Sequence, residues 1–294
     1  MSHNDSTTLA EISERNRIWD KHKANNNRIA DLYKGSKFDK YQQRMQHCGN
    51  SLEFSLESDK LKLTDARFCR VRYCPVCQWR RSLKWKARAY AALPKILQNH
   101  PKSRWLFLTL TIKNCEINEL RETLTSMHQS FKRLTKLKAW YVEGWIKSTE
   151  ITLGQDGLAH PHFHCLLMVK PSYFSGEHYL SQAKWAELWQ QCLRINYLPV
   201  VDVRAIKASV CPTTIIPEVL KYQTKSEDLT ADQDWLLELT AQTHGSRAIS
   251  VGGILSDYLK KSDFQGSPSE ADTEEASFFL RAYWSSKKNL YCVP

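Results

Sequence analysis

Four cysteines in the first third of the chain constrain its fold more than any other feature. Cys69, Cys74 and Cys77 stand close together in the segment CRVRYCPVCQWRR, and Cys48 precedes them. The Cys-Pro-x-Cys turn aims two thiolates at one point, and a tetrahedral zinc ion needs four ligands at about 2.3 Å for sulfur. We therefore predict a structural zinc site with Cys48 as the fourth ligand and His47 as its alternative. The competing interpretation, a set of small buried apolar residues, is disfavoured by the polar and basic setting.

The cysteine count and the charge narrow the class of protein. Nine cysteines are an odd number for a secreted disulfide framework, and the opening MSHNDSTTLAEISERN lacks the apolar core of a signal peptide. We therefore expect a cytoplasmic protein without a membrane partner, in which clustered cysteines bind metal. The net charge of +11 predicts an anionic partner. Nucleic acid is favoured over a membrane surface.

Composition divides the chain of 294 residues into four segments. The first is a polar helix and arm, the second a zinc-binding and basic DNA-binding segment, the third a candidate catalytic core, and the fourth a C-terminal extension. These segments cover residues 1–40, 41–100, 101–230 and 231–294. Within the extension, residues 262–275 are rich in Ser, Asp, Glu and Gly and predict a flexible loop, and the aromatic stretch 277–293 predicts either a hairpin or a helix.

The third segment predicts an α+β fold. Four short β-rich runs alternate with three runs of helical period, which gives the order β-α-β-β-α-β-α. An antiparallel sheet with helices packed on one face fits this order. The turn sequence Gly-Gln-Asp-Gly at 154–157 joins the second and third strands. The predicted strands are 105–112, 139–152, 158–169 and 198–206, and the predicted helices are 118–137, 178–194 and 215–225.

A dense run of basic residues surrounds the cysteines, and Trp79 and Trp85 are interleaved with it. Arginine and lysine contact phosphates, while aromatic rings offer stacking surfaces. The run therefore predicts a DNA-binding surface, with an ordinary solvated helix face as the alternative. The candidate residues are Arg70, Arg72, Arg80, Arg81, Lys84, Lys86 and Arg88.

Three histidines alternate along one predicted strand, AHPHFHCLLMV. Residues two apart on a strand point to the same side, so His160, His162 and His164 project from one face. The preceding turn returns Glu150 along the neighbouring strand, and mixed nitrogen and oxygen ligation suits Mg²⁺ or Mn²⁺ as well as zinc. We predict a catalytic divalent metal held by His162, His164 and either Glu150 or His160. The open coordination positions of such a site would suit a hydrolase or an oxygenase equally.

A third cluster occurs in the segment PEVLKYQTKSED, where Glu218, Tyr222 and Lys225 fall at i, i+4 and i+7. On a helix these residues share one face. A tyrosine can attack phosphate covalently, a lysine can neutralise the phosphate charge, and a carboxylate one turn away can deprotonate a water. Taken alone, the pattern fits an ordinary surface helix better than a catalytic site.

Taken together, the motifs resemble a known family. The segments FLTLT (107–111) and HPHFH (160–164) and the pair Tyr222-x-x-Lys225 follow one another, with Glu218 four residues before the tyrosine. This arrangement, with a Cys-rich segment ahead of it, resembles the rolling-circle replication initiators of small bacterial plasmids, within the HUH endonuclease superfamily. The resemblance covers about residues 45–260. It implies a ferredoxin-like or RNA-recognition-motif-like sheet, with the paired histidines on a central strand, plus a zinc-binding subdomain with four cysteine ligands.

The resemblance also implies a mechanism. A Mn²⁺ or Mg²⁺ ion at the histidines would polarise the scissile phosphate, and Tyr222 would attack it to give a 5′-phosphotyrosine and a 3′-OH primer. Lys225 would position the phosphate or the tyrosine, Lys221 would lie near the phosphate, and Glu218 would activate water in termination or pair with Lys221. The implied partners are plasmid origin DNA, as a hairpin or single strand at the nick site, and the host helicase and polymerase.

Two other interpretations remain open at this point. The first is a conjugative relaxase or a single-tyrosine transposase, although relaxases usually place the tyrosine before the histidines and such transposases are generally shorter and lack the zinc segment. The second is a non-enzymatic, zinc-containing DNA-binding regulator whose histidine cluster is structural. A covalent protein–DNA adduct separates an enzyme from this regulator.

Overall fold

The structure is a computed structural model, and it describes residues 7–57, 59–207, 212–221, 224–260 and 279–294. Tyr222 and the loop expected at 262–275 lie outside the described residues. The chain forms two compact units. Unit 1 contains Met1–Arg81, Leu229–Leu237 and Gln265–Pro294, and unit 2 contains Ser82–Asp228 and Glu238–Phe264.

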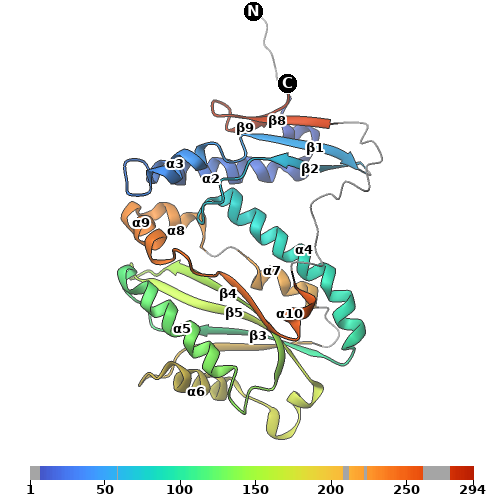
Figure 1. The fold of residues 1–294 in the computed structure, drawn as a ribbon, viewed down its shortest axis with the longest axis vertical. Coiled ribbons are helices and arrows are strands. Elements are labelled where there is room, and N and C mark those ends of the chain that lie inside the picture. The colour runs from blue at the N-terminus through green and yellow to red at the C-terminus, as the bar shows by residue number, and fades with distance from the viewer. Residues whose placement is uncertain (1–6, 58, 208–211, 222–223, 261–278) are drawn as a thin grey trace, which may run out of the picture. The chain divides into compact units, whose positions relative to one another are not determined.

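Unit 1 contains a four-stranded antiparallel sheet in the order β2-β1-β8-β9 (Figure 1). Its strands come from both ends of the chain, since the C-terminal strand β8 pairs with the free edge of β1. The stretch 277–293, which the sequence left open between hairpin and helix, forms a hairpin in its described part. The strands are β1 (Ser51–Glu57), β2 (Lys60–Ala66), β8 (Phe279–Ser285) and β9 (Leu290–Cys292).

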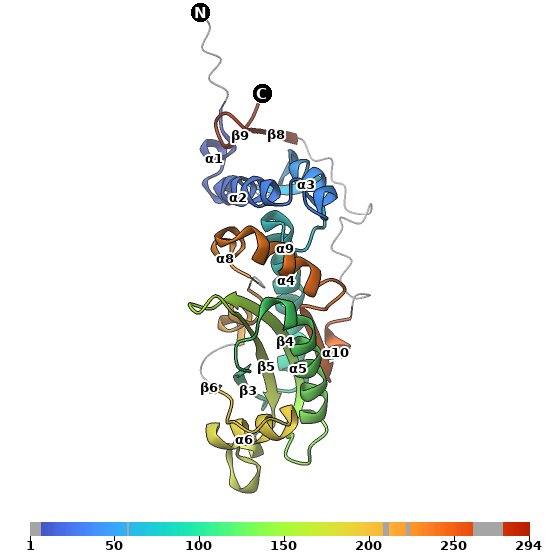
Figure 2. The same cartoon turned by 90° about the vertical axis from the view of Figure 1, so that its left-hand side faces the viewer.

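The N-terminal segment of unit 1 is helical, as expected, and α2 and α3 lie side by side (Figure 2). Helix α2 buries Trp19 and Ile29, but also the polar side chains of Lys23 and Asn26. Buried polar groups need hydrogen-bond partners. The partners of Lys23 and Asn26 lie at and next to the cysteines that are described below. The helices are α1 (Leu9–Ile12), η1 (Glu14–Arg17, 3-10), α2 (Ile18–Leu32) and α3 (Asp39–Gln46).

Unit 2 contains a five-stranded antiparallel sheet in the order β6-β3-β5-β4-β7, of which Figure 1 labels β3, β4 and β5. The predicted α+β fold is confirmed, with the β-α-β-β-α-β order of a ferredoxin-like unit and β5 at the centre. Strand β7 adds to the outer edge of β4, where a Cβ on Gly252 would lie 2.3 Å from the Trp145 ring. The strands are β3 (Arg104–Thr111), β4 (Val142–Leu153), β5 (Ala159–Val169), β6 (Val201–Ile206) and β7 (Ile249–Gly253).

The other helices either lie within unit 2 or contain residues of both units. Helix α4 starts in unit 1 and continues in unit 2, and α8 and α9 also cross a boundary between units. The helices are α4 (Pro75–Asn99), α5 (Leu120–Leu134), α6 (Gln182–Leu193), α7 (Ile216–Val219), α8 (Ser226–Ala231), α9 (Gln233–Gln242) and α10 (Leu255–Tyr258). Short 3-10 helices are η2 (Ile117–Glu119), η3 (Pro171–Phe174), η4 (Gly176–His178) and η5 (Pro212–Thr214). Among the described helices, none has the length and apolarity needed to cross a membrane.

Helices cover both faces of the unit 2 sheet, so the expectation of one covered face is wrong. On one face α5 and α6 pack Phe131 and Trp189 against Phe163. On the other, residues 82–99 of α4 pack with α7 and α10 against Leu166 and its neighbours. The physical reason is that β5 is buried at ten of its eleven positions and β3 at five of its eight, and a sheet with two apolar faces must be covered on both.

The helix predicted over 215–225 is shorter than expected. Helix α7 ends at Val219, Leu220 leaves helical geometry with φ −104° and ψ 25°, and the next described helix starts at Ser226. The buried Leu220 carbonyl accepts a hydrogen bond from Ser82 of α4. Glu218 and Lys225 therefore do not share one continuous helical face.

Candidate metal centres

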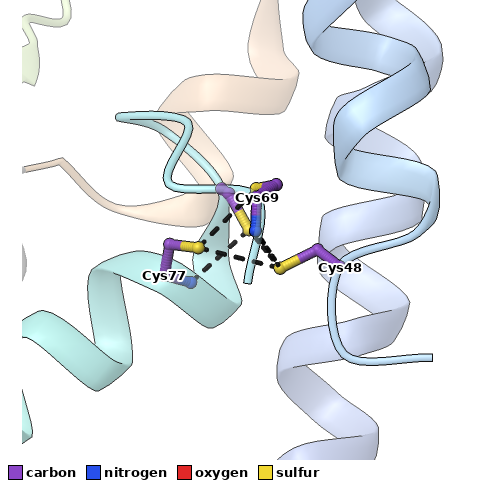
Figure 3. A group of neighbouring side chains, drawn as sticks. Cys48, Cys69 and Cys77 are labelled. Carbon is purple, nitrogen blue, oxygen red and sulfur yellow. Dashed lines mark hydrogen bonds between the residues drawn. The ribbon is translucent and has the colours of Figure 1, made fainter. Parts of the chain in front are cut away.

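Four cysteine sulfurs converge in unit 1. The Sγ atoms of Cys48 and Cys77 are 3.7 Å apart, those of Cys69 and Cys77 3.6 Å, and those of Cys74 and Cys48 3.7 Å; Figure 3 shows Cys48, Cys69 and Cys77 directed toward one another. A disulfide would need about 2.05 Å. Four sulfurs at about 2.3 Å from a tetrahedral ion lie about 3.8 Å apart. The four buried side chains thus fit one metal ion, and His47 is not in the group.

The surroundings of the cysteines stabilise negative charge on sulfur. Lys23, which is 0% exposed, donates to the carbonyls of Gln46 and Cys48, both at 2.9 Å. Four thiolates on a divalent ion carry two net negative charges, which a buried ammonium group partly balances. Backbone amides also donate to sulfur at 3.3–3.4 Å, namely those of Cys69, Arg70, Val71 and Cys77.

We expect Cys74→Ser to remove the bound metal and to destabilise unit 1. A structural zinc site contributes on the order of 10 kcal/mol to folding, and three ligands hold the ion far less tightly. The measurement is zinc content per chain by mass spectrometry, combined with a thermal melt followed by circular dichroism. Cys292→Ser is the matched control, because Cys292 is a free, partly exposed cysteine of unit 1 outside the cluster. Equal zinc content in the two variants would contradict the site.

A second group of metal-binding side chains lies in unit 2, on the paired strands β4 and β5. Glu150 stands opposite His162 in the antiparallel register. Its Oε2 atom lies 3.1 Å from His162 Nε2 and 2.8 Å from His164 Nε2. Glu150, His162 and His164 are the described members of this group, and His160, opposite Thr152, is not among them. The geometry favours Glu150 over His160 as the third ligand.

The three side chains pass two tests for a divalent ion. Two ligands at about 2.1 Å from an octahedral ion and at right angles lie about 3 Å apart, which matches the observed separations. The histidine protons are compatible with this. His162 Nδ1 lies 3.3 Å from the carbonyl of His160, which only accepts, so a proton on Nδ1 would leave Nε2 available as a metal ligand. Without a metal ion, Nε2–H groups donate to Glu150 Oε2, and a divalent ion would take the place of those protons.

Contacts behind these side chains hold them in place. Thr109 of β3 lies 3.2 Å from His164 Nδ1 and fixes that ring from the side away from Glu150. Burial raises the pKa of Glu150, but hydrogen bonds from His162, His164 and Lys221 outweigh burial, so this pKa lies well below its usual value. Glu150 is therefore an anionic oxygen ligand at neutral pH.

The described residues before and after Tyr222 both contact strand β4, which carries Glu150. Lys221 Nζ lies 2.9 Å from Glu150 Oε2, and Leu220 is fixed by the hydrogen bond from Ser82. After the two residues that the structure does not describe, Thr224 is buried, and Asp228 accepts from the Leu153 amide at the end of β4 at 3.3 Å. Lys225 is exposed.

Glu218 has a different partner from the one considered in the sequence. Arg204 of β6 donates to it at 3.2 Å across an exposed ion pair, while Lys221 pairs with Glu150. Sequence patterns assigned no role to Arg204 or to Thr109. The threonine could have been found, because it lies in the FLTLT segment next to the histidine strand in a β-α-β-β order, whereas nothing local marks Arg204.

The basic residues that were predicted to bind DNA differ in how far their side chains are exposed to solvent. Arg70 and Lys84 are exposed, and Arg72, Arg81 and Lys86 are half-buried. Arg80 stacks on the rings of Trp19 and Phe68, and Arg88 is buried over Trp85 at 4.8 Å. Trp79 packs on His22 and Trp19 within unit 1. The exposed and half-buried cations thus offer more surface to a phosphate than Arg88 does.

Comparison with known proteins places this chain in a family. A family model described as "Replication protein" matches residues 60–289, which include both groups of metal-binding side chains apart from Cys48. The chain belongs to this replication protein family. The resemblance to plasmid replication initiators, which the motif order predicted, is thereby confirmed at the level of the family.

Curated relatives of this replication protein cover most of its length. A protein named "Protein rep" from Lactiplantibacillus plantarum is 39% identical over 254 residues, covering 81% of this chain and 80% of the relative. A "Protein rep" from Streptococcus pneumoniae is 32% identical over 297 residues, covering 95% and 92%. Another, from Lentilactobacillus hilgardii, is 34% identical over 263 residues, covering 85% and 83%. No solved structure matches the replication protein.

Proposed function

We propose that this replication protein initiates rolling-circle replication of a plasmid by nicking one strand of the origin DNA. The observation that carries the proposal is the joint placement of Glu150, His162 and His164 with Lys221, the residue directly before Tyr222. A divalent-metal site and a tyrosine are the two elements needed for a covalent attack on phosphate. The family assignment supports a role in replication.

The proposed chemistry is a phosphoryl transfer to tyrosine. Mn²⁺ or Mg²⁺ at Glu150, His162 and His164 would supply the Lewis acid that polarises the scissile phosphate. The Tyr222 oxygen, losing its proton, forms a bond to phosphorus, and the bond from phosphorus to the 3′ oxygen breaks. The 3′ oxygen takes up a proton and leaves as a 3′-OH, which can prime a polymerase, while the 5′ phosphate stays on Tyr222. Lys225, which is exposed, neutralises the phosphate charge.

We propose that Glu218 acts in termination. It is held by Arg204 in an exposed ion pair rather than by Lys221, so a water can reach its carboxylate. Glu218 would deprotonate that water, whose oxygen forms a bond to phosphorus at the regenerated nick site while the bond from phosphorus to the 3′ oxygen breaks. The 3′ oxygen takes up a proton, which leaves a 3′-OH and a free 5′ phosphate without a second tyrosine.

Covalent adduct formation tests the proposed function. The full-length protein is mixed with a single-stranded origin oligonucleotide of its own replicon and Mn²⁺, then separated on a denaturing gel. An oligonucleotide labelled at its 3′ end should give a labelled, protein-sized band, whereas a 5′ label should appear on a shortened free strand. Absence of any adduct with every single-stranded origin sequence would instead favour a DNA-binding regulator.

We further propose that the zinc segment and the basic residues after it recognise the duplex part of the origin. Neutralising Arg80, Arg81 and Lys84 to Gln should weaken origin binding by about ten- to a hundredfold. A plot of log affinity against log salt concentration should also become less steep, by about three in slope, if each residue contacts one phosphate. Cleavage of a short single-stranded oligonucleotide should stay intact.

The control for this prediction replaces three exposed lysines outside this basic segment, Lys132, Lys136 and Lys138, by Gln. This variant loses the same formal charge, so it reports the effect of net charge alone. Duplex binding is measured by fluorescence anisotropy over a range of salt concentrations. If duplex binding and single-strand cleavage fell equally in the Arg80, Arg81 and Lys84 variant, the recognition assignment would be wrong.

A further inference from the structure

A single oxygen atom of Glu150 is the meeting point of three neighbouring side chains. His162, His164 and Lys221 all approach Oε2, and the ammonium group of Lys221 lies 2.9 Å from it. The carboxylate side chain is only 5% exposed, whereas that of Lys221 is 41% exposed. The lysine therefore reaches from the solvent side to a buried anion. The positive charge of the lysine pairs with the buried carboxylate, which would otherwise be an unpaired buried charge.

We propose that Lys221 is a positioning residue that acts through Glu150 and competes with the divalent cation for it. In the metal-free protein its ammonium group holds the carboxylate in the orientation that a metal ion uses. When the ion binds, the ammonium group leaves, because two cations on one oxygen repel each other. This inference rests on the proposed function, since it takes Glu150, His162 and His164 as the ligands of the nicking metal.

The surrounding chain allows this exchange without a change of fold. Leu220, directly before the lysine, is 1% exposed and is fixed by the hydrogen bond from Ser82. The backbone can stay in place while the flexible four-carbon stem of the lysine turns toward solvent. Because Lys221 directly precedes Tyr222, the charge that leaves the carboxylate stays in the segment that would meet the scissile phosphate. Metal loading would thus convert a counter-ion of Glu150 into a phosphate contact.

Metal affinity in the absence of DNA tests this inference. Titration calorimetry with Mn²⁺ alone compares the full-length wild-type protein with Lys221→Met and Lys221→Arg. Removal of the competing ammonium group should tighten Mn²⁺ binding by about three- to tenfold. Lys221→Arg keeps the charge and should remain within about twofold of wild type. Lys170→Met is the matched control, because it removes a mostly exposed lysine of unit 2 whose partner is Glu143.

Each outcome decides the proposal. Tighter binding in Lys221→Met, with Lys170→Met unchanged, supports competition at Glu150, and slower nicking by the same variant supports the phosphate contact. Unchanged or weaker Mn²⁺ binding in Lys221→Met would overturn the proposal, and Lys221→Gln serves in its place if that variant fails to fold. A wild-type protein that forms no adduct would defeat the proposed function, whereas the Mn²⁺ titration would still decide whether Lys221 competes.

Discussion

Replacing Tyr222 by Phe is expected to abolish the covalent adduct with origin DNA and to lower the nicking rate by on the order of 10⁴-fold or more. Removal of a nucleophile leaves only the rate contributions of binding and electrostatic stabilisation. Phe keeps the ring and loses a single oxygen, so the fold should not change. The measurement is the denaturing gel with a 3′-labelled origin oligonucleotide, run as a time course with Mn²⁺.

The control is Tyr179→Phe, which removes the hydroxyl of a tyrosine that is 56% exposed in unit 2. Its adduct yield should equal that of wild type. Duplex origin binding should also be the same in both variants and in wild type, because neither hydroxyl belongs to the proposed recognition residues. An adduct that persists in Tyr222→Phe would show that another residue is the nucleophile.

The sheet of unit 2 could be predicted because its signals are local. The alternation of His160, His162 and His164 and the turn at 154–157 determine which residues of β4 and β5 oppose one another. Glu150 accordingly lies on the strand next to the histidines, as expected, and the structure places it opposite His162. The sheet of unit 1 could not be predicted in the same way. Its strand β8 pairs with β1 from the far end of the chain, and no local pattern specifies a partner at that distance.

The grouping of the candidate ligands was predictable, but the contacts that support them were not. Cysteine spacing and histidine alternation place the candidate ligands of each group within short segments of the sequence. By contrast, the end of α7 at Val219 coincides with a hydrogen bond from Ser82 to Leu220, a contact between residues far apart in sequence. Lys221 was expected near the phosphate, and its pairing with Glu150 emerges only from the packing of that segment against β4.

Replacing Glu150 by Gln is expected to weaken Mn²⁺ binding by on the order of a hundredfold and to suppress nicking in parallel. The amide has the shape of the carboxylate but lacks its charge, and an uncharged oxygen is a poor ligand for a hard cation. The ammonium group of Lys221 also loses its buried anionic partner. Binding is measured by titration calorimetry without DNA, and nicking by the gel assay at a Mn²⁺ concentration close to the dissociation constant of the wild-type protein.

Glu143→Gln is the matched control, since Glu143 lies on the same strand but pairs only weakly, at 3.8 Å, with Lys170. It should bind Mn²⁺ as wild type does. If Glu150→Gln also bound Mn²⁺ normally while His160→Ala did not, the third ligand would be His160, the alternative that the histidine spacing left open. If His162→Ala were likewise without effect, the strand would hold no catalytic metal, and nicking would have to proceed from Tyr222 and the lysines alone.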